Sequence, residues 1–185
     1  MWGSGPADVY AVGTGGSIRR WDGGTWASLS SPTAAILFDV WGSGPNDIWI
    51  VGSGGTTIHH TGAGFLAVDS GTVQTLYGVY GRAPNDVYAV GASGQIIRWD
   101  GTAWQAETSN TFSDLLSVGG VGNTVFAGGT NGTALRLTDA GTWVATSTGT
   151  TRSFTSFWGN APNNLYGVAT FGEIKRWNGT TWSTQ

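Results

Sequence analysis

Apolar residues fall in short segments along this chain, and Gly-, Asn- and Asp-rich turns separate them. The segment 48–51 is Ile-Trp-Ile-Val, and the segment 95–99 is Gln-Ile-Ile-Arg-Trp. Runs of about five β-branched and aromatic residues, with turns every eight to twelve residues, are typical of all-β proteins. The dipeptide Asp100-Gly101 follows the second of these segments and is a strong hairpin signal. The pattern therefore predicts many short antiparallel strands.

One block of sequence occurs five times at equal spacing. The five copies begin at residues that lie 39 positions apart, and the fourth copy is degraded: Trp2, Trp41, Tyr80, Gly119 and Trp158. A period between about 20 and 50 residues indicates a solenoid, a propeller or another repeat array. Each copy contains four predicted strands, and four strands in about 40 residues select the β-propeller. We predict an all-β fold of five blades, each with four antiparallel strands.

The repeat also divides the chain, whose 185 residues fit a single propeller domain over 1–185. The predicted blades cover about 2–30, 34–69, 73–108, 112–148 and 152–185. The first blade lacks most of its innermost strand, and neither end has a spare strand to close the ring by exchange. Closure would then depend on blade-to-blade packing, on further blades of a larger ring, or on a second copy in a homo-oligomer.

Composition excludes several classes of partner. Charged residues make up 10% of the chain, the net charge is −3 and Lys175 is the single lysine, whereas nucleic acid needs clustered cations. With no cysteine there are neither disulfides nor thiolate metal sites. No apolar run is long enough for membrane insertion. No signal peptide precedes Trp2, which already belongs to the first repeat, so the sequence suggests a segment of a longer chain. The low share of charged residues is not typical of a cytosolic surface, and we expect an extracellular or cell-surface location.

Two motifs carry a resemblance to known propellers. They are Trp-Gly-Ser-Gly-Pro-Asn-Asp-Ile-Trp at 41–49 and Gly-x-Ile-x-Arg-Trp-Asp-Gly-x-x-Trp at 94–104. The pattern resembles a repeat of bacterial secreted propellers and that of tectonin-type propeller lectins, over essentially the whole chain. By architecture alone, five blades are similar to the tachylectin lectins. The resemblance implies a propeller fold and, through the lectins, glycan binding.

A more distant resemblance concerns the Asp-box of sialidase propellers, Ser-x-Asp-x-Gly-x-Thr-Trp. The segments 139–143 and 22–26 come near it, but each is one residue short between Gly and Thr. In sialidases this box is a structural turn remote from catalysis, so the resemblance implies no enzyme.

The acidic residues and histidines predict no catalytic or metal site. Asp8, Asp47, Asp86, Asp22, Asp100 and Asp139 recur in turns, where Asp caps its own backbone. The acidic residues outside the repeat pattern are Asp39, Asp69, Glu107, Asp114 and Glu173. A glycosidase needs two carboxylates at a fixed distance, and nothing places two of these together. His59 and His60 point to opposite faces of a strand and cannot chelate one metal. We expect no enzyme, cofactor or metal.

Repeated aromatic residues beside turns are the candidate binding residues. Arg20-Trp21, Arg98-Trp99 and Arg176-Trp177 each place a guanidinium and an indole near a blade rim, where Asp100 adds a carboxylate. A second set, Trp41, Tyr80 and Trp158, together with Trp2, follows the first strand. The copies two and four are expected to carry His60-Thr61 and Leu137-Thr138 in place of the Arg-Trp pair. The alternative is that the indoles cover an outer apolar layer, with Arg stacked on them.

These residues support two function hypotheses from different classes. In the first, the protein is a lectin-like, multivalent glycan-binding module with equivalent sites at blade rims or between blades, which gain avidity. In the second, it is a protein-interaction scaffold of a larger extracellular protein, which predicts one asymmetric patch. A reconstructed or amplified propeller with no evolved ligand is a further alternative.

Overall fold

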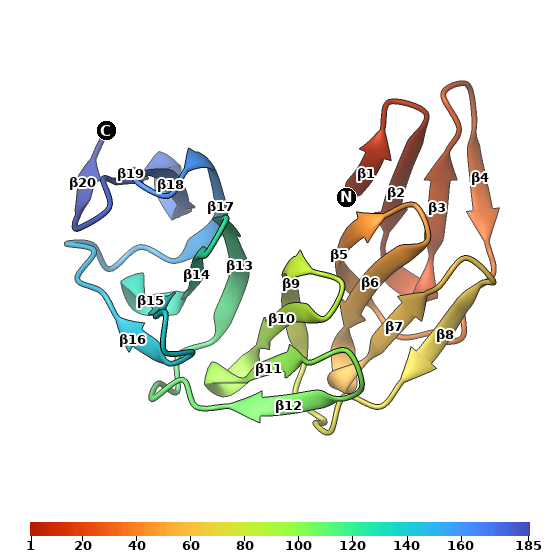
Figure 1. The fold of residues 1–185 in the computed structure, drawn as a ribbon, viewed down its shortest axis with the longest axis horizontal. Helices are drawn as coiled ribbons and strands as arrows, with labels where there is room; N and C mark the ends of the chain where they lie inside the picture. The colour runs from red at the N-terminus through yellow and green to blue at the C-terminus, as the bar shows by residue number, and fades with distance from the viewer. The chain divides into compact units, whose positions relative to one another are not determined.

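The computed structural model describes all residues 1–185 and consists of five four-stranded antiparallel sheets (Figure 1). In every sheet the strands lie in chain order, so each blade is a meander of three hairpins. This confirms the predicted propeller of five blades.

The blades have the following strands. The first has β1 (Trp2–Gly5), β2 (Asp8–Val12), β3 (Ile18–Trp21) and β4 (Trp26–Leu29). The second has β5 (Leu37–Gly44), β6 (Asp47–Gly52), β7 (Thr57–His60) and β8 (Phe65–Val68). The third has β9 (Leu76–Ala83), β10 (Asp86–Gly91), β11 (Ile96–Trp99) and β12 (Trp104–Glu107). The fourth has β13 (Leu115–Val121), β14 (Thr124–Gly129), β15 (Ala134–Leu137) and β16 (Trp143–Ala145). The fifth has β17 (Phe154–Ala161), β18 (Asn164–Ala169), β19 (Ile174–Trp177) and β20 (Trp182–Thr184).

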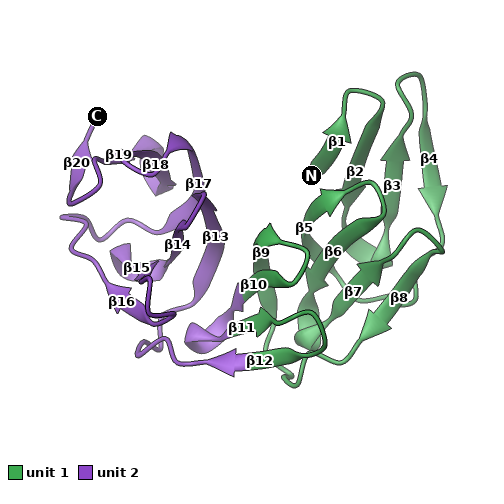
Figure 2. Cartoon of the chain, viewed as in Figure 1, with its two compact units in different colours: residues 1–89, 97–105 green, residues 90–96, 106–185 purple.

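The chain divides into two compact units (Figure 2). The first comprises residues 1–89 and 97–105, and therefore the first two blades and most of the third. The second comprises residues 90–96 and 106–185, with the fourth and fifth blades. None of the helices reaches the length and apolarity that a membrane-spanning helix needs.

The core of the first unit lies between blades. Trp49 and Val51 pack with Val87, Ala89 and other residues of the third blade. The alternate residues of the same strand, Ile48 and Ile50, pack with Tyr10 and Ile18 of the first blade. Successive strand residues face opposite sides, so β6 is buried on both faces. This explains why its sequence is a continuous apolar run and does not alternate.

The second unit is built in the same way around Phe126. This fully buried side chain of β14 packs with Leu165, Trp177 and Trp182 of the fifth blade. Phe154 fills a neighbouring cluster with Ala134 and Ala169. Aromatic residues thus occupy the space between consecutive sheets.

The Gly-rich segments after each second strand form one-turn 3-10 helices where the sequence suggested simple hairpin turns. These are η1 (Thr14–Gly16), η2 (Ser53–Gly55), η3 (Ala92–Gly94), η4 (Thr130–Gly132) and η5 (Thr170–Gly172). The last residue of each is a glycine with positive φ. At Gly55 a Cβ atom would overlap the carbonyl oxygen of Thr72, in the segment that leads to the third blade. The turn and the connection between blades therefore require glycine there.

Strand register corrects the expected alignment of the second and fourth copies. Arg20 lies opposite Tyr10 and Arg176 lies opposite Tyr166, while His59 lies opposite Trp49. The equivalents of Arg-Trp in these copies are therefore His59-His60 and Arg136-Leu137. The expected His60-Thr61 and Leu137-Thr138 were wrong by one residue. The error matters because a slip of one residue moves every side chain to the opposite face.

Candidate binding site between the first two blades

The arginines expected to bind a ligand are bonded within their own blades. Arg20 Nε donates to Asp8 Oδ1 at 2.6 Å, and Arg98 Nε donates to Asp86 Oδ1 at 2.7 Å. Arg176 Nε donates to Asn164 Oδ1 at 2.8 Å. Each bond joins the third strand of a blade to the start of its second strand, twelve residues earlier. The second blade makes the same link between His59 Nε2 and Asp47 Oδ1 at 2.6 Å.

Electrostatics strengthen this link. Burial alone would raise the pKa of Asp86, but hydrogen bonds from Arg82 and Arg98 lower it below its ordinary value. Burial, together with the nearby Asp86 carboxylate, raises the pKa of Tyr88 to about 12. The blade edge is therefore held by an ionised carboxylate shared between two guanidinium groups and a neutral phenol.

The tryptophans beside these arginines fill the space between blades. Trp99 and Trp104 approach Trp49 of the preceding blade, with ring centroids 4.7 and 4.9 Å apart. In the second unit, Trp177 is 5% exposed and lies with its ring centroid 5.1 Å from that of Phe126. These two indoles have aromatic neighbours in the position where a sugar ring would stack.

The third of these tryptophans lies differently. Trp21 and Trp26 contact each other on the first blade, with ring centroids 5.7 Å apart. Trp26 is 42% exposed, whereas its equivalents Trp104 and Trp182 are buried.

The other residues that were predicted to bind a ligand do not lie together in one site either. The Trp41 indole lies over Gly81 of the next blade, where a Cβ atom would overlap it, and contacts Tyr80. Asp100 accepts hydrogen bonds from the backbone amides of Thr102 and Ala103, and bonds from the Thr102 side chain and these amides lower its pKa. Trp158 is 65% exposed on the fifth blade. The structure does not gather these residues into one site.

The second blade departs from the Trp-Trp arrangement. Strand register places His60 and Phe65 opposite one another, as Trp21 and Trp26 are in the first blade. In the fifth blade Trp177 and Trp182 are paired in the same way. Imidazole and phenyl rings are much smaller than two indoles. Next to Tyr10 of the preceding blade, the smaller pair leaves space unfilled.

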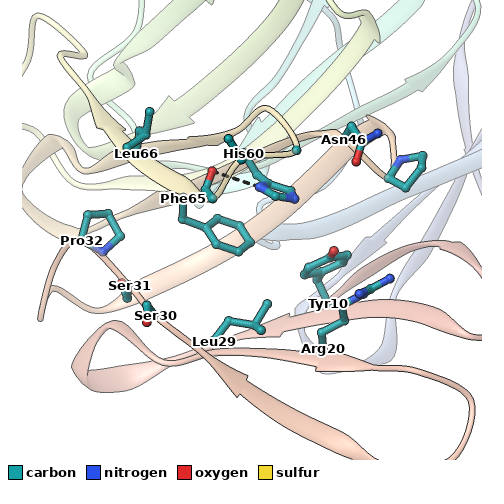
Figure 3. A pocket seen from close by; sticks show the side chains of 14 residues that line it. Tyr10, Arg20, Leu29, Ser30, Ser31, Pro32, Asn46, His60, Phe65 and Leu66 are labelled. Carbon is teal, nitrogen blue, oxygen red and sulfur yellow. Dashed lines mark hydrogen bonds between the residues drawn. The ribbon is translucent and has the colours of Figure 1, made fainter.

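That space is a pocket of about 700 Å³ within the first unit (Figure 3). The first blade and the segment after it supply Tyr10, Arg20, Leu29, Ser30, Ser31 and Pro32. The second blade supplies Pro45, Asn46, His60, Gly62, Ala63, Gly64, Phe65 and Leu66. In Figure 3, His60 and Phe65 face Tyr10 and Leu29 across the opening.

The aromatic walls are fixed by their contacts. Tyr10 is 3% exposed and meets Phe65 edge-on, with ring centroids 6.2 Å apart. His60 stacks on Phe65 at 4.7 Å, and its Nδ1 donates to the Gly64 carbonyl oxygen at 3.0 Å. The His60 ring is therefore held in place at the pocket wall.

The polar wall combines a carboxylate, a phenol and a guanidinium. Burial would raise the pKa of Asp8, but hydrogen bonds from Ser4 and Arg20 lower it overall. Burial and the Asp8 carboxylate raise the pKa of Tyr10. The Arg20 side chain is 46% exposed although its Nε is bonded to Asp8. Its remaining N–H groups can donate to a ligand that enters the pocket.

Of the residues predicted to bind a ligand, Arg20 alone lines this pocket. Sequence reasoning missed Tyr10, His60 and Phe65. The sequence did contain a signal for this pocket: the second copy has His60 and Phe65 where the first copy has Trp21 and Trp26. The equivalence at position 60 was missed because the predicted alignment of the second copy was wrong by one residue.

The five acidic residues outside the repeat pattern serve as structural acceptors. Glu107 accepts from Trp143 Nε1 at 2.6 Å, and Glu173 from the Thr150 hydroxyl at 2.6 Å. Backbone amides donate to the other three, Asp39, Asp69 and Asp114. No group of three or more His, Asp or Glu residues is arranged to hold a metal ion.

The buried carboxyl group of Asp39 is expected to make the free energy of unfolding depend on pH. Its carboxylate accepts from the amides of Val40 and Val79 at 2.9 and 3.0 Å, but burial outweighs these bonds and raises its pKa. The folded state therefore holds this proton more tightly than the unfolded state. Protonation of Asp39 therefore stabilises the folded state. This stabilisation is complete below about pH 4, the ordinary pKa of Asp, and is lost as the pH rises through the raised pKa of the folded state.

Urea unfolding of Asp39→Asn between acidic and neutral pH tests this dependence. The stability of the variant relative to the wild type should increase with pH. Asp139→Asn, at an exposed turn, serves as a control that should follow the wild type. Parallel profiles for Asp39→Asn and the wild type would refute the assignment.

Comparison with known proteins gives a structural likeness only. No family model matches the chain, and no curated protein sequence is similar to it. Among solved structures, YCF48 bound to a D1 peptide is 19% identical with a TM-score of 0.72, over 98% of this chain and 64% of that one. YCF48 from Cyanidioschyzon merolae is 15% identical with a TM-score of 0.70, over 95% and 66%.

A third similar structure is the computationally designed Ika8 protein, 20% identical with a TM-score of 0.77, over 96% of this chain and 57% of that one. The chain thus spans about two thirds or less of the length of these structures. At such identities the likeness supports the repeat propeller fold and carries no function. The resemblance to tectonin-type and bacterial secreted propellers gains no support from it.

Proposed function

We propose that this protein is a non-enzymatic peptide-binding module whose site is the pocket between its first two blades. The observation that carries the proposal is the departure of one blade from the repeat. A multivalent lectin would need equivalent rim sites, whereas Trp177 is buried and Arg20, Arg98 and Arg176 are bonded within their blades. A pocket that forms where this blade carries His60 and Phe65 in place of the indole pair favours one asymmetric site, as a protein-interaction propeller requires.

The lining suits an apolar side chain carried by an extended peptide. Ligand pockets are mostly apolar, with a few polar groups that fix orientation. Tyr10, Phe65 and Leu29 provide an apolar space between them. Arg20 and the Asn46 amide lie at its border and can donate to a backbone carbonyl or a carboxylate of the peptide. We expect an aromatic or large aliphatic anchor next to such an acceptor.

The comparisons add support of a general kind. One similar propeller structure is described as bound to a peptide, so this fold can present a peptide site. With charged residues at 10% of the chain, we also propose an extracellular or cell-surface location.

A glycan is the second candidate ligand. Aromatic rings beside hydroxyl and amide groups also suit a sugar, and the pocket offers Tyr10 and Phe65 beside Ser30 and Asn46. The two candidates share one site and differ in the ligand, so one set of variants tests both.

The test begins with a phage-displayed random peptide library panned on the immobilised chain, and with a glycan array in parallel. Enriched peptides are then synthesised and titrated calorimetrically into the wild type and into His60→Trp/Phe65→Trp. This double variant restores the indole pair that the fifth blade contains, so it should fold while filling the pocket. Val73→Trp, at a side chain 84% exposed outside the pocket, is the matched control.

We expect enriched peptides with an apolar anchor, and a loss of affinity in the double variant of at least about thirty-fold, the effect of blocking an interface hot spot. The control should bind like the wild type. Equal affinity for the double variant and the wild type would exclude this pocket as the site. Glycan signals without enriched peptides would show that the ligand of this protein is a saccharide and not a peptide.

A further inference from the structure

The pocket between the first two blades has a basic end and an apolar end. The fourteen residues that line it include one arginine, Arg20, and neither aspartate nor glutamate. In Figure 3, Arg20 and Asn46 lie at one end of the opening, and Leu29 and Phe65 lie toward the other. All of these residues belong to the first unit, so the arrangement is a property of that unit alone.

Arg20 is held in position and still has donors for a ligand. A guanidinium group carries several N–H groups in a rigid fork. Its Nε donates to Asp8 Oδ1 at 2.6 Å, and its Cζ lies 5.9 Å from the centroid of the Tyr10 ring. Asp8 also accepts from the Ser4 hydroxyl and is not among the residues that line the pocket. The N–H groups on the terminal nitrogens of Arg20 can therefore donate to a ligand.

A carboxylate is the acceptor that suits these donors best. Its two oxygens match the guanidinium fork, and hydrogen bonds between charged partners are roughly twice as strong as those between neutral ones. A backbone carbonyl offers only one neutral oxygen, and an ammonium group would meet Arg20 as a like charge. The amide of Asn46, an exposed residue at the same end, supplies a further neutral donor.

We infer that the ligand presents a carboxylate to Arg20 while its apolar side chain fills the space between Tyr10 and Phe65. The inference rests on the proposed peptide-binding function and narrows the class of peptide. The carboxylate comes from an Asp or Glu residue beside the apolar anchor, or from a C-terminal residue whose own side chain is the anchor. Both sources place the same group next to the same apolar side chain.

The arginines of the other blades do not share this role. Arg98 and Arg176 also donate through Nε to a residue twelve positions earlier, but neither of them lines the pocket. Arg176→Gln is therefore a matched control for Arg20→Gln, because each variant loses the same kind of bond within its own blade.

The experiment is an NMR titration of the wild type and these two variants with four short peptides. One pair is acetyl-Gly-Ser-Gly-Phe with a free C-terminal carboxylate and the same peptide with a C-terminal amide. The other pair is acetyl-Ser-Phe-Glu-Ser-amide and acetyl-Ser-Phe-Gln-Ser-amide, in which the acid is a side chain. Circular dichroism shows whether the variants keep the wild-type fold.

We expect the wild type to bind the carboxylate peptide of at least one pair about ten-fold more tightly than its amide partner. The pair that shows the preference identifies the source of the carboxylate. In Arg20→Gln the preference should fall below about two-fold because the charged donor is lost, whereas Arg176→Gln should keep it. Added salt should weaken binding of the preferred carboxylate peptide and not of its amide partner, which tests the charge without any substitution.

Equal affinities within both pairs would overturn the inference and leave the pocket as a site for neutral peptides. A preference that survives in Arg20→Gln, or one without any salt dependence, would overturn it as well. So would the absence of binding by all four peptides. The proposed function itself would fail only if panning of the peptide library also yielded no ligand.

Discussion

Replacing Gly55 with alanine is expected to destabilise the protein by about 3 kcal/mol or more. Gly55 has a φ of +74°, where an L side chain is strained. In addition, its Cβ would overlap the carbonyl oxygen of Thr72, which is backbone and cannot rotate away. The added methyl group must therefore displace the connection between the second and third blades.

Gly54→Ala is the matched control. Gly54 has a similar φ of +63°, but a Cβ there would have no neighbour within 4 Å. Other blades carry Ser93, Asn131 and Phe171 at this position with positive φ, so a side chain is tolerated. Urea unfolding should give a cost of about 1 kcal/mol for Gly54→Ala. Similar costs for the two variants would contradict the proposed overlap.

Replacing Trp49 with alanine is the second large effect, with an expected cost of about 3–5 kcal/mol. The side chain is fully buried in the junction between the second and third blades. His59 stacks on one face with ring centroids 4.0 Å apart, and Trp99 and Trp104 pack against it from the third blade. Alanine would leave a cavity that three rigid rings cannot fill.

Trp49→Phe separates ring packing from the indole N–H. Trp49 Nε1 is buried and has no hydrogen-bond partner, so phenylalanine removes an unsatisfied donor as well as part of the ring. The fourth blade uses Phe126 at this position. Thermal and urea unfolding should therefore show a cost of about 1–2 kcal/mol for Trp49→Phe. A phenylalanine variant as unstable as the alanine variant would show that packing of the whole indole is required.

The sequence was sufficient to predict the blades, because each copy contains its own strands and turns. The equal spacing from Trp2 to Trp158 and the turn at Asp100-Gly101 are local features, and they define four strands per copy. Alternation of side chains then explains why Ile48 and Trp49 serve different blades.

The site could not be predicted in the same way, because it depends on which residues of consecutive blades meet. Repeated arginines suggested open ligand contacts, but their partners lie twelve residues earlier, on a neighbouring strand. Repeated tryptophans suggested sugar platforms, but the preceding blade supplies Trp49 or Phe126 to cover them. The pocket exists where His60 and Phe65 are too small to fill that space.

If the pocket between the first two blades binds a peptide, NMR should locate the bound peptide there. Isotope-labelled protein would be titrated with the peptide selected by panning, and amide and aromatic shifts would be followed. We expect the largest changes at Tyr10, Arg20, His60 and Phe65, and none at Trp99 or Trp177. Changes centred on the indoles of the third and fifth blades, with none at the pocket, would contradict it.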